Sequence, residues 1–509
     1  MNKILRFTLV ILCFLGHSHG QSQTIQSKLV DATTQEAIPY ASILLASNKG
    51  VISNEDGMFT LHLKKKITAK DSLFITYMGY EPKAIPLLHF KDSIIYLNEQ
   101  AIALNSILIS NKHYSAEEII KKVKENLTKN YPTTLTKKRI FFRQSYHQDL
   151  SKMKYTFIKS SIEALNKNLL DSFLQSIPKT EDHYTEILCD LYGDFSLKKQ
   201  KIHLIKACEL YDKNNTPNLE FVEKKLVKIL KDNVKPNSYF KIKSGLFGFK
   251  IEEGKLFQST KDTTDTAAIK KELADKKKRE TTRKTNFSKY KKNRMAELFE
   301  ELFFLEGSKL NFIHKYNRYD FKLLDYAYDG ETPLYIISFE PKWLADYRGK
   351  LYVNADDFAL VRVDYSNVKP IKSISLLRIS YKTTIDKGKL IFTKGENKKY
   401  NLRYLEKETG AIVGIKRPLK IIEKNKHVKG RRKQNELSIK LDLTISNLDK
   451  SEIVIFDSQE ISSINFNDFK EKNVILPTYL PAYDPQFWKD HTIIAPNDAI
   501  KAFTIKENK

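Results

Sequence analysis

Cysteine is scarce in this chain of 509 residues, with three copies at positions 13, 189 and 208. The scarcity excludes a disulfide-rich scaffold and leaves too few thiolates for a structural zinc site. An oxidising compartment would permit a bridge between Cys189 and Cys208, but two separate buried thiols fit their spacing equally well. The sequence therefore predicts neither a metal site nor a cofactor site.

Catalytic motifs are also lacking. No His-Glu-x-x-His helix, Gly-x-Ser-x-Gly elbow, phosphate-binding loop or dinucleotide glycine pattern occurs. The carboxylate pairs Glu117-Glu118 and Asp356-Asp357 are explained by a helix start and a hairpin turn. Ordinary surface or core roles suit the isolated histidines, which are His113, His147, His183, His203, His314 and His427.

We therefore assign no catalytic residue and predict that the protein is not an enzyme. The alternative is an envelope-associated enzyme acting on glycans or peptides. Its site would be assembled from distant residues, as carboxylate pairs of glycosidases are, and would leave no local signature in the sequence.

Acidic residues are outnumbered, 61 against 87 lysines and arginines, which gives a formal net charge of +26. Basic runs at residues 64–66, 276–279, 291–294 and 431–433 carry much of this charge. Such a surface suits anionic lipid headgroups, lipopolysaccharide or acidic glycans, and the alternative is a solvated lysine-rich surface. No motif that reads DNA or RNA accompanies the runs, so nucleic acid is not predicted as a partner.

No apolar run reaches the roughly twenty residues that a membrane-spanning helix needs. A shorter run at residues 7–15 follows Lys3 and Arg6 and precedes the small and polar residues 16–20, which is typical of a secretory signal peptide. Lipidation of Cys13 does not fit, because the bulky Leu12 precedes it. We predict a signal peptide over residues 1–20 and a mature chain that is exported, in the periplasm or associated with the outer membrane.

Aromatic residues are plentiful, with 26 tyrosines and 29 phenylalanines, which favours packed sheets over disorder. Short β-type runs between turn residues predict an all-β sandwich over residues 23–99. The turn Asp56-Gly57 is expected to close a hairpin, because glycine reaches positive φ without strain. The predicted strands are residues 25–31, 40–47, 58–63, 72–77, 83–88 and 93–97.

Three motifs stand in order in this region, after Val30-Asp31. They are Ile38-Pro39-Tyr40-Ala41-Ser42-Ile43, Ser53-Asn54-Glu55-Asp56-Gly57-Met58-Phe59 and Ile75-Thr76-Tyr77-Met78-Gly79-Tyr80. Together they resemble the carboxypeptidase regulatory-like domain, a transthyretin-like (prealbumin-type) sandwich common in exported Bacteroidota proteins and in front of TonB-dependent receptors. The glycine often found before its first strand is replaced here by Ser27-Lys28. The resemblance implies a scaffold without zinc ligands.

The pattern changes after this region, and we place the domain boundary between Asn98 and Tyr114, after a further β-type run at residues 101–110. Ser115-Ala116-Glu117-Glu118 is a capping box, which predicts a helix that ends near Pro132. Residues 111–509 are predicted to form an α+β domain that resembles an uncharacterised exported family, with a charged insertion or loose helix at about residues 259–290. Further helices are expected at residues 169–177, 221–230 and 295–304, and strands at residues 141–146 and 155–161.

Antiparallel sheet is expected after residue 310. The clearest unit is a hairpin over residues 346–365 that turns at Asp356-Asp357. Further runs at residues 373–383, 389–392, 400–406 and 438–446 make a meander similar to the curved sheet of lipoprotein-carrier-like periplasmic proteins. The predicted fold class is mainly β with helices: an all-β N-terminal sandwich and an α+β C-terminal domain with a curved antiparallel sheet.

These observations predict a non-enzymatic exported envelope protein with a binding or scaffold role. In the binding hypothesis, the C-terminal half-barrel takes an apolar ligand such as a lipid or an acyl chain. In the scaffold hypothesis, sheet edges and the basic surface dock on partners. The candidate partners are a lipid or another anionic envelope component, and an outer-membrane protein.

Overall fold

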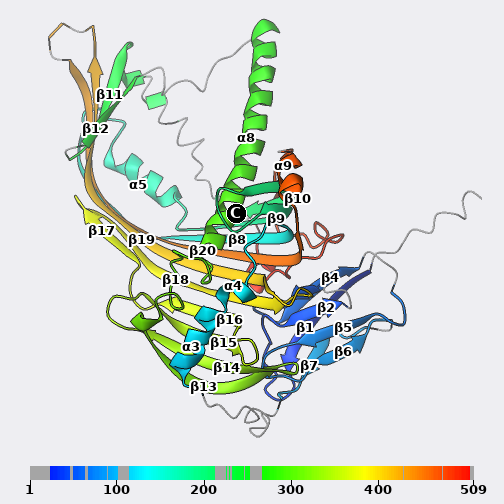
Figure 1. Ribbon diagram of the computed structural model, residues 1–509. Helices are drawn as coiled ribbons and strands as arrows, with labels where there is room; N and C mark the ends of the chain where they lie inside the picture. Colours follow the sequence, from blue (N-terminus) through cyan, green and yellow to red (C-terminus); the bar gives the residue numbers. More distant parts are fainter. Residues whose placement is uncertain are drawn as a thin grey trace, which may run out of the picture. The chain divides into compact units, whose positions relative to one another are not determined.

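The structure is a computed structural model, drawn as a ribbon in Figure 1. It describes residues 23–45, 50–63, 67–88, 90–100, 114–212, 225, 228–229, 232–245, 247–252, 266–427, 429–430, 432–472 and 474–504. The predicted signal peptide, the basic run 64–66, the β-type run 101–110, His113 and most of the helix expected at 221–230 lie outside the described residues. Strands account for 53% of the structure, which confirms the predicted fold class, mainly β with helices.

The chain divides into two compact units. The sandwich unit comprises Met1–Asn111, Tyr326–Leu334 and Asp484–Ala502. The large-sheet unit comprises Lys112–Asp325, Tyr335–Tyr483 and Phe503–Lys509.

The sandwich unit contains two sheets, with strand orders β4-β1-β7 and β3-β2-β5-β6. The side chains of Ile43, Phe59 and Ile75 are fully buried in its core. All six predicted strands are present, and the short β3 was not predicted. The strands are β1 (Gln23–Asp31), β2 (Ser42–Leu45), β3 (Gly50–Ile52), β4 (Met58–Leu63), β5 (Ser72–Thr76), β6 (Lys83–Pro86) and β7 (Ile94–Leu97).

The turn at Asp56-Gly57 does not close a hairpin, so that prediction was wrong. β3 pairs with β2 whereas β4 pairs with β1, and the turn carries the chain from one sheet to the other. Gly57 does adopt a positive φ, of +75°. Asn54 shapes the turn, because its Oδ1 accepts hydrogen bonds from the backbone N–H groups of Asp56 (3.0 Å) and Met58 (2.8 Å).

The motifs of the sandwich are bonded to one another. The Tyr80 hydroxyl donates to Oδ2 of Asp31 at 2.6 Å. The Ser53 hydroxyl accepts from the N–H of Ala41 and donates to the carbonyl of Ile38, both at 2.9 Å. These bonds hold turns and strand ends together, so the motif residues serve the scaffold.

The segment Asp484–Ala502 completes the sandwich unit from the far end of the sequence. Ile493 forms an antiparallel bridge with Thr60 of β4. The side-chain amide of Asn54 donates to the carbonyl of Pro496 at 3.1 Å. The segment includes the short helix α10 (Asp498–Lys501), and its buried apolar side chains are Trp488, Ile493, Ile494, Ala495 and Ile500.

The large-sheet unit is organised on one sheet with the order β13-β14-β15-β16-β18-β19-β20-β8-β9-β10-β21, while β11, β12 and β17 pair off this path. Three strands are very long: β8 (Thr136–Ser160), β19 (Tyr400–Asn425) and β20 (Lys433–Glu460). Figure 1 shows β19 and β20 bending along their length. The others are β9 (Thr180–Gly193), β10 (Gln200–Tyr211), β11 (Ser238–Ser244), β12 (Phe247–Glu252), β13 (Tyr319–Asp329), β14 (Thr332–Pro341), β15 (Tyr347–Asn354), β16 (Leu360–Asn367), β17 (Lys372–Leu376), β18 (Ile379–Lys394) and β21 (Thr478–Leu480).

Several predicted elements of this unit are confirmed. The capping box starts α3 (Ala116–Glu125), with the Ser115 N–H donating to Oε2 of Glu118 at 2.7 Å, and the short α4 (Leu127–Asn130) follows. The hairpin at Asp356-Asp357 is formed by β15 and β16. The predicted strands at 141–146 and 155–161 are both parts of β8, and the helix at 169–177 corresponds to α5 (Lys167–Ser176).

The charged stretch near residues 259–290 belongs largely to a single helix, α8 (Thr266–Glu300). Its C-terminal turns are apolar, and Met295 and Phe299 are fully buried. Phe303, just after the helix, packs edge-on against Tyr131 and Phe392 with ring centroids 5.2 and 5.6 Å away. This apolar end anchors a helix whose preceding residues are mostly polar. Among the described helices, which also include α9 (Ser463–Asp468), none is long and apolar enough to cross a membrane.

Candidate functional site

The hairpin of β17 and β18 turns without a glycine or an asparagine. Leu377 and Arg378 form its two-residue turn, with φ values of +50° and +64°. The prediction of a single strand over residues 373–383 was therefore wrong. The turn was missed because the sequence carries none of the residues that usually mark a turn of this kind. Side chains with a Cβ are strained at positive φ.

One face of this hairpin is apolar. Ile374 stands opposite Tyr381, and Leu376 stands opposite Ile379, so the four side chains project from the same face. Their exposed fractions range from 38% for Tyr381 to 66% for Leu376. Exposure of this extent means that the described residues leave this ladder of large apolar side chains uncovered.

A second hairpin, β11–β12, adds two phenylalanines. β11 pairs with β19 in the register Ile242 to Ile421 and Lys243 to Lys420. The hairpin turns at Gly245, which has a φ of +62°. Phe247 and Phe249 on β12 are 59% and 61% exposed.

Arg417 of β19 joins the two hairpin turns. Its Nε donates to Oγ of Ser244 at 2.8 Å, and its Nη2 donates to the Ser244 carbonyl. Its Nη1 donates to the carbonyl of Leu377 at 2.9 Å, and the guanidinium lies 5.3 Å from the ring centroid of Phe247. The side chain is largely buried, and its hydrogen bonds fix the position of the two turns relative to each other.

Between the hairpins lies a groove of about 380 Å³, which we call the tip groove. Its lining is apolar apart from two cationic side chains, Lys372 and Arg417. The Nζ of Lys372 lies 5.8 Å from the ring centroid of Tyr381. The groove is lined by Phe247, Lys372, Ile374, Leu376, Leu377, Ile379, Tyr381 and Arg417.

The strand segments around the tip groove carry charge of one sign. Residues 369–385 contain four lysines and arginines, residues 410–422 contain three and residues 238–250 contain three. None of these stretches contains an aspartate or a glutamate. Four of these ten cations form ion pairs with acidic residues outside the stretches: Lys250 with Glu252, Lys369 with Asp346, Lys416 with Asp442 and Lys420 with Glu436. The groove therefore combines apolar walls with a surrounding in which cations are in excess.

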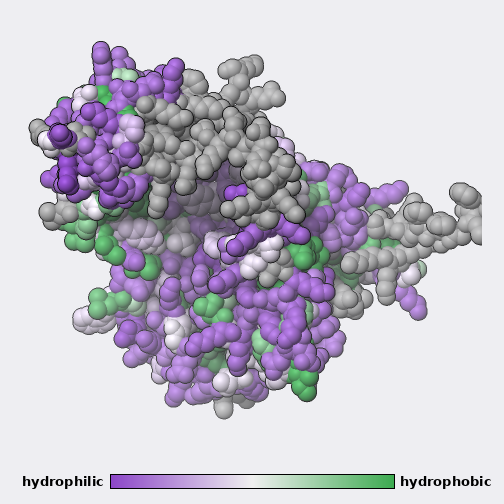
Figure 2. All heavy atoms as spheres, turned by 90° about the horizontal axis from the view of Figure 1, so that it is seen from above, coloured by the Kyte–Doolittle hydropathy of each residue, from purple (hydrophilic) through white to green (hydrophobic). Residues whose placement is uncertain are grey.

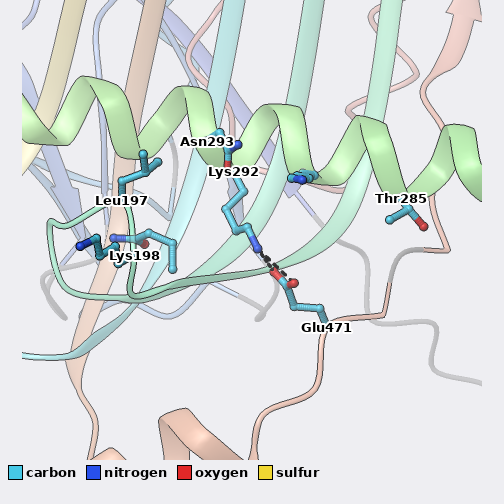
Figure 3. Close-up of a pocket in the computed structure, with 8 residues that line it drawn as sticks. Leu197, Lys198, Thr285, Lys292, Asn293 and Glu471 are labelled. Carbon is cyan, nitrogen blue, oxygen red and sulfur yellow. Dashed lines mark hydrogen bonds and ion pairs between the residues drawn. The ribbon is translucent and has the colours of Figure 1, made fainter.

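A smaller pocket of about 240 Å³ lies beside α8 and is drawn in Figure 3. Lys292 of α8 reaches across to Glu471, with Nζ and Oε1 2.9 Å apart. Oε1 of Glu471 also accepts from the N–H of Ile202 at 2.8 Å. Because its principal charged groups already pair with each other, this pocket is a weaker candidate than the tip groove. Its lining residues are Leu197, Lys198, Gln200, Thr285, Lys289, Lys292, Asn293 and Glu471.

The basic run 291–294 is not simply a solvated surface. Lys291 is buried, and its Nζ donates to Oε1 of Gln144 at 2.8 Å. Burial lowers the pKa of this lysine to about 8. Arg294 donates from Nη2 to Oδ1 of Asp449 at 2.8 Å. These contacts attach α8 to the sheet, whereas residues 277–279 of the run 276–279 are exposed.

Glu186 follows His183 by three residues, which is the spacing of the histidine and glutamate ligands in a carboxypeptidase zinc site. Positions i and i+3 of a strand point to opposite faces. Glu186 instead accepts from Nε of Arg143 at 2.7 Å, and both side chains are 1% exposed. Glu452 flanks Arg143 on the other side, with Oε2 3.8 Å from Nη1. This buried ionic row holds β9, β8 and β20 together.

The other histidines and cysteines considered in the sequence do not come together in one site. His147 lies 2.7 Å from Oδ1 of Asp182 at the surface, and His183 packs against the ring of Tyr211. Cys189 and Cys208 are buried and form no disulfide with each other, because they stand opposite Leu204 and Glu186 in the register of β9 and β10. The Sγ of Cys208 lies 3.7 Å from Oε2 of Glu186. Burial raises the pKa of the Cys189 thiol. No group of three or more His, Cys, Asp or Glu side chains within the described ranges is placed to hold a metal ion.

Solved structures that are similar to this chain have low TM-scores with it. A domain described as that of an outer membrane lipoprotein-sorting protein from Vibrio parahaemolyticus is 7% identical, with a TM-score of 0.20, over 69% of this chain and 97% of that one. A LolA superfamily protein from Nitrosomonas europaea is 9% identical, with a TM-score of 0.15, over 70% and 98%. MucB in complex with MucA is 7% identical, with a TM-score of 0.14, over 64% and 93%. Scores this low do not show a common fold, so the expected likeness to lipoprotein carriers stays a prediction.

No curated protein matches the chain. One family model does match, and it covers residues 25–109. This range contains the three motifs of the sandwich. Its description is the CarboxypepD_reg-like domain, so the N-terminal part of this chain carries a CarboxypepD_reg-like domain.

Proposed function

We propose that this chain is a non-enzymatic, exported envelope protein that binds an anionic amphiphile, with the acyl chain of the ligand in the tip groove. The observation that carries the proposal is the groove itself: apolar walls, uncovered by the described residues, with Lys372 and Arg417 in the lining. The layout of residues 1–20 as a signal peptide supports the exported location.

The size of the groove suits part of a lipid chain. Ligand pockets in proteins usually measure about 300–1,000 Å³, and this one lies near the lower end. An acyl chain that buries several hundred Å² of apolar surface gains ~25 cal/mol per Å², enough for micromolar binding after the cost of association.

The head group of the ligand would meet the cations of the groove. Arginine has five N–H donors, and the bonds of Arg417 to Ser244 and Leu377 use three of them. Two donors remain for a carboxylate or phosphate oxygen, and Lys372 adds an ammonium group. Attraction of this kind weakens as salt increases.

The test is titration of a fluorescent long-chain fatty acid into the mature chain at low and high ionic strength. We expect saturable micromolar binding that is weaker at high salt. Ile374→Asp and Leu376→Asp should each weaken it at least tenfold, because each places a carboxylate in the groove. The matched control is Ile464→Asp on α9, which alters a 71% exposed isoleucine outside the groove and should leave the affinity unchanged.

Lys372→Gln tests the contribution of the ligand's head group to the affinity separately from that of its acyl chain. It should reduce the affinity and the salt dependence together while the apolar walls stay intact. Absence of saturable binding at either salt concentration, or equal affinities of the groove and control variants, would contradict the proposal and leave the scaffold role.

A further inference from the structure

The tip groove does not account for all the exposed apolar surface around it. Eight of the twenty-one large hydrophobic side chains that are exposed among the described residues belong to the ends of β11–β12, β17–β18 and the adjoining part of β19. Phe249 and Ile412 are among them but do not line the groove. Figure 2 shows hydrophobic side chains, in green, gathered on the left, the side on which Figure 1 places β17.

Four members of this group stand at the hairpin ends. We call Phe247, Phe249, Leu376 and Leu377 the tip surface; their exposed fractions are 59%, 61%, 66% and 45%. Leu377 lies in the turn itself at positive φ, a strained position where a small polar residue would be expected. Almost half of this large apolar side chain is left exposed.

The charges around the tip surface indicate which kind of partner it can bind. The three stretches around it contain ten lysines and arginines, four of which pair with acidic residues outside the stretches, so an excess of positive charge remains. A second copy of the chain would bring the same positive charge to the contact, so self-association through this surface is disfavoured. Apolar side chains ringed by basic ones match the boundary of an anionic lipid leaflet, where the rings and aliphatic chains enter the acyl region and the cations meet the head groups.

We propose that the tip surface docks on an anionic lipid bilayer and inserts Phe249, Leu376 and Leu377 into its outer layer. This deepens the proposed function, on which it rests only for the nature of the ligand: the tip groove then opens at the lipid boundary, and the bilayer is the source of the amphiphile. Arg417 keeps the two hairpin turns together, so that both enter the same leaflet.

The experiment is flotation of the mature chain with vesicles of phosphatidylethanolamine and phosphatidylglycerol, compared with vesicles of phosphatidylcholine alone. We expect binding to the anionic vesicles that is at least tenfold tighter than to the zwitterionic ones. Phe249→Asp should reduce flotation at least tenfold. Its fatty-acid affinity in solution should not change, since Phe249 lies outside the groove. Ile464→Asp is the control and should float like the parent chain.

Each outcome separates the two proposals. Fatty-acid binding in solution without flotation overturns the docking and leaves the proposed function. Flotation without fatty-acid binding overturns the groove and leaves the docking. Flotation that Phe249→Asp and Leu377→Asp do not alter, but that salt abolishes, shows a purely electrostatic contact and overturns insertion. Absence of both activities contradicts both proposals and leaves a protein partner for the tip surface.

Discussion

Two glycines of the sandwich unit have similar backbones and different surroundings. Gly57 and Gly79 have φ values of +75° and +81°. A Cβ on Gly57 would lie 2.6 Å from the carbonyl oxygen of Leu29, whereas a Cβ on Gly79 would meet nothing within 4 Å. The two positions therefore separate backbone strain from steric conflict.

We expect Gly57→Ala to destabilise the protein by more than the roughly 1–3 kcal/mol that positive φ alone costs. Gly79→Ala should show only that strain. Denaturant unfolding followed by circular dichroism measures both. Equal losses in the two variants would show that the backbone at Gly57 relaxes away from Leu29.

Asp31 makes the sandwich unit sensitive to acid. The hydrogen bond from Tyr80 is the largest cause of a lowered pKa, about 2, and the backbone N–H groups of Thr33 and Thr34 contribute. Because the pKa is lower in the folded state than its usual 3.8, the stabilisation is present above pH 4 and is lost as the pH falls from about 4 to 2.

Tyr80→Phe removes the largest cause of this shift. We expect the loss of stability of the parent chain between pH 4 and pH 2 to be shallower in Tyr80→Phe, with reduced stability at pH 7. Melting temperatures across this range are the measurement. A parallel pH profile in the two proteins would mean that Tyr80 does not set the pKa of Asp31.

Residue patterns in the sequence predicted contacts between neighbouring residues but did not predict contacts between distant ones. Ser115 and Glu118 cap α3 as expected, because both partners lie within one turn of the chain. Arg417 could not be recognised, because its partners Ser244 and Leu377 lie 173 and 40 residues away. The tip groove exists only where these separate segments meet.

At the scale of the element, strands with strong turn signals were predicted closely. β4 (Met58–Leu63) has the expected bounds. The turn after β17 was missed because Leu377 and Arg378 carry no turn signal. The pairing of β3 and β4 was also missed, because the two strands belong to different sheets and local residue patterns do not show to which sheet a strand belongs.

We expect that a change in the turn between β17 and β18 can raise the stability of the protein while it lowers the affinity for the ligand. Replacing Leu377 and Arg378 by Asn and Gly supplies residues that favour positive φ, and we expect about 1 kcal/mol of added stability. Fatty-acid affinity should fall, because Leu377 lines the tip groove. Thermal unfolding and the fluorescence titration give the two quantities.

Lys398→Gly is the matched control for this exchange. Lys398 also has a positive φ, of +60°, in the turn between β18 and β19, and it does not line the groove. It should stabilise the chain and leave the affinity unchanged. A turn variant that gains stability and binds as the parent does would show that Leu377 makes no contact with the ligand.

At the scale of the whole molecule, the sandwich unit takes in a segment from the far end of the sequence. The expectation that residues 23–99 form the sandwich describes its strands but not the contribution of Asp484–Ala502. Nothing in that segment has the alternation of a long strand. It joins through one backbone bridge, between Ile493 and Thr60, through hydrogen bonds such as that from Asn54 to Pro496, and through buried side chains. Such a contact has no periodic pattern from which it could be predicted.

The two tryptophans of the chain provide the test. Trp488 lies in this segment and is 3% exposed, whereas Trp343 is 98% exposed in the loop between β14 and β15. We expect Trp488→Ala to destabilise the sandwich unit by about 3–5 kcal/mol, the usual cost of removing a buried aromatic side chain, while Trp343→Ala changes stability by less than about 0.5 kcal/mol. Hydrogen exchange should locate the loss in Trp488→Ala at β4, where the segment is bridged. If instead the amides of β4 stay as protected in Trp488→Ala as in the parent, the side chain of Trp488 does not support the contact between the C-terminal segment and β4.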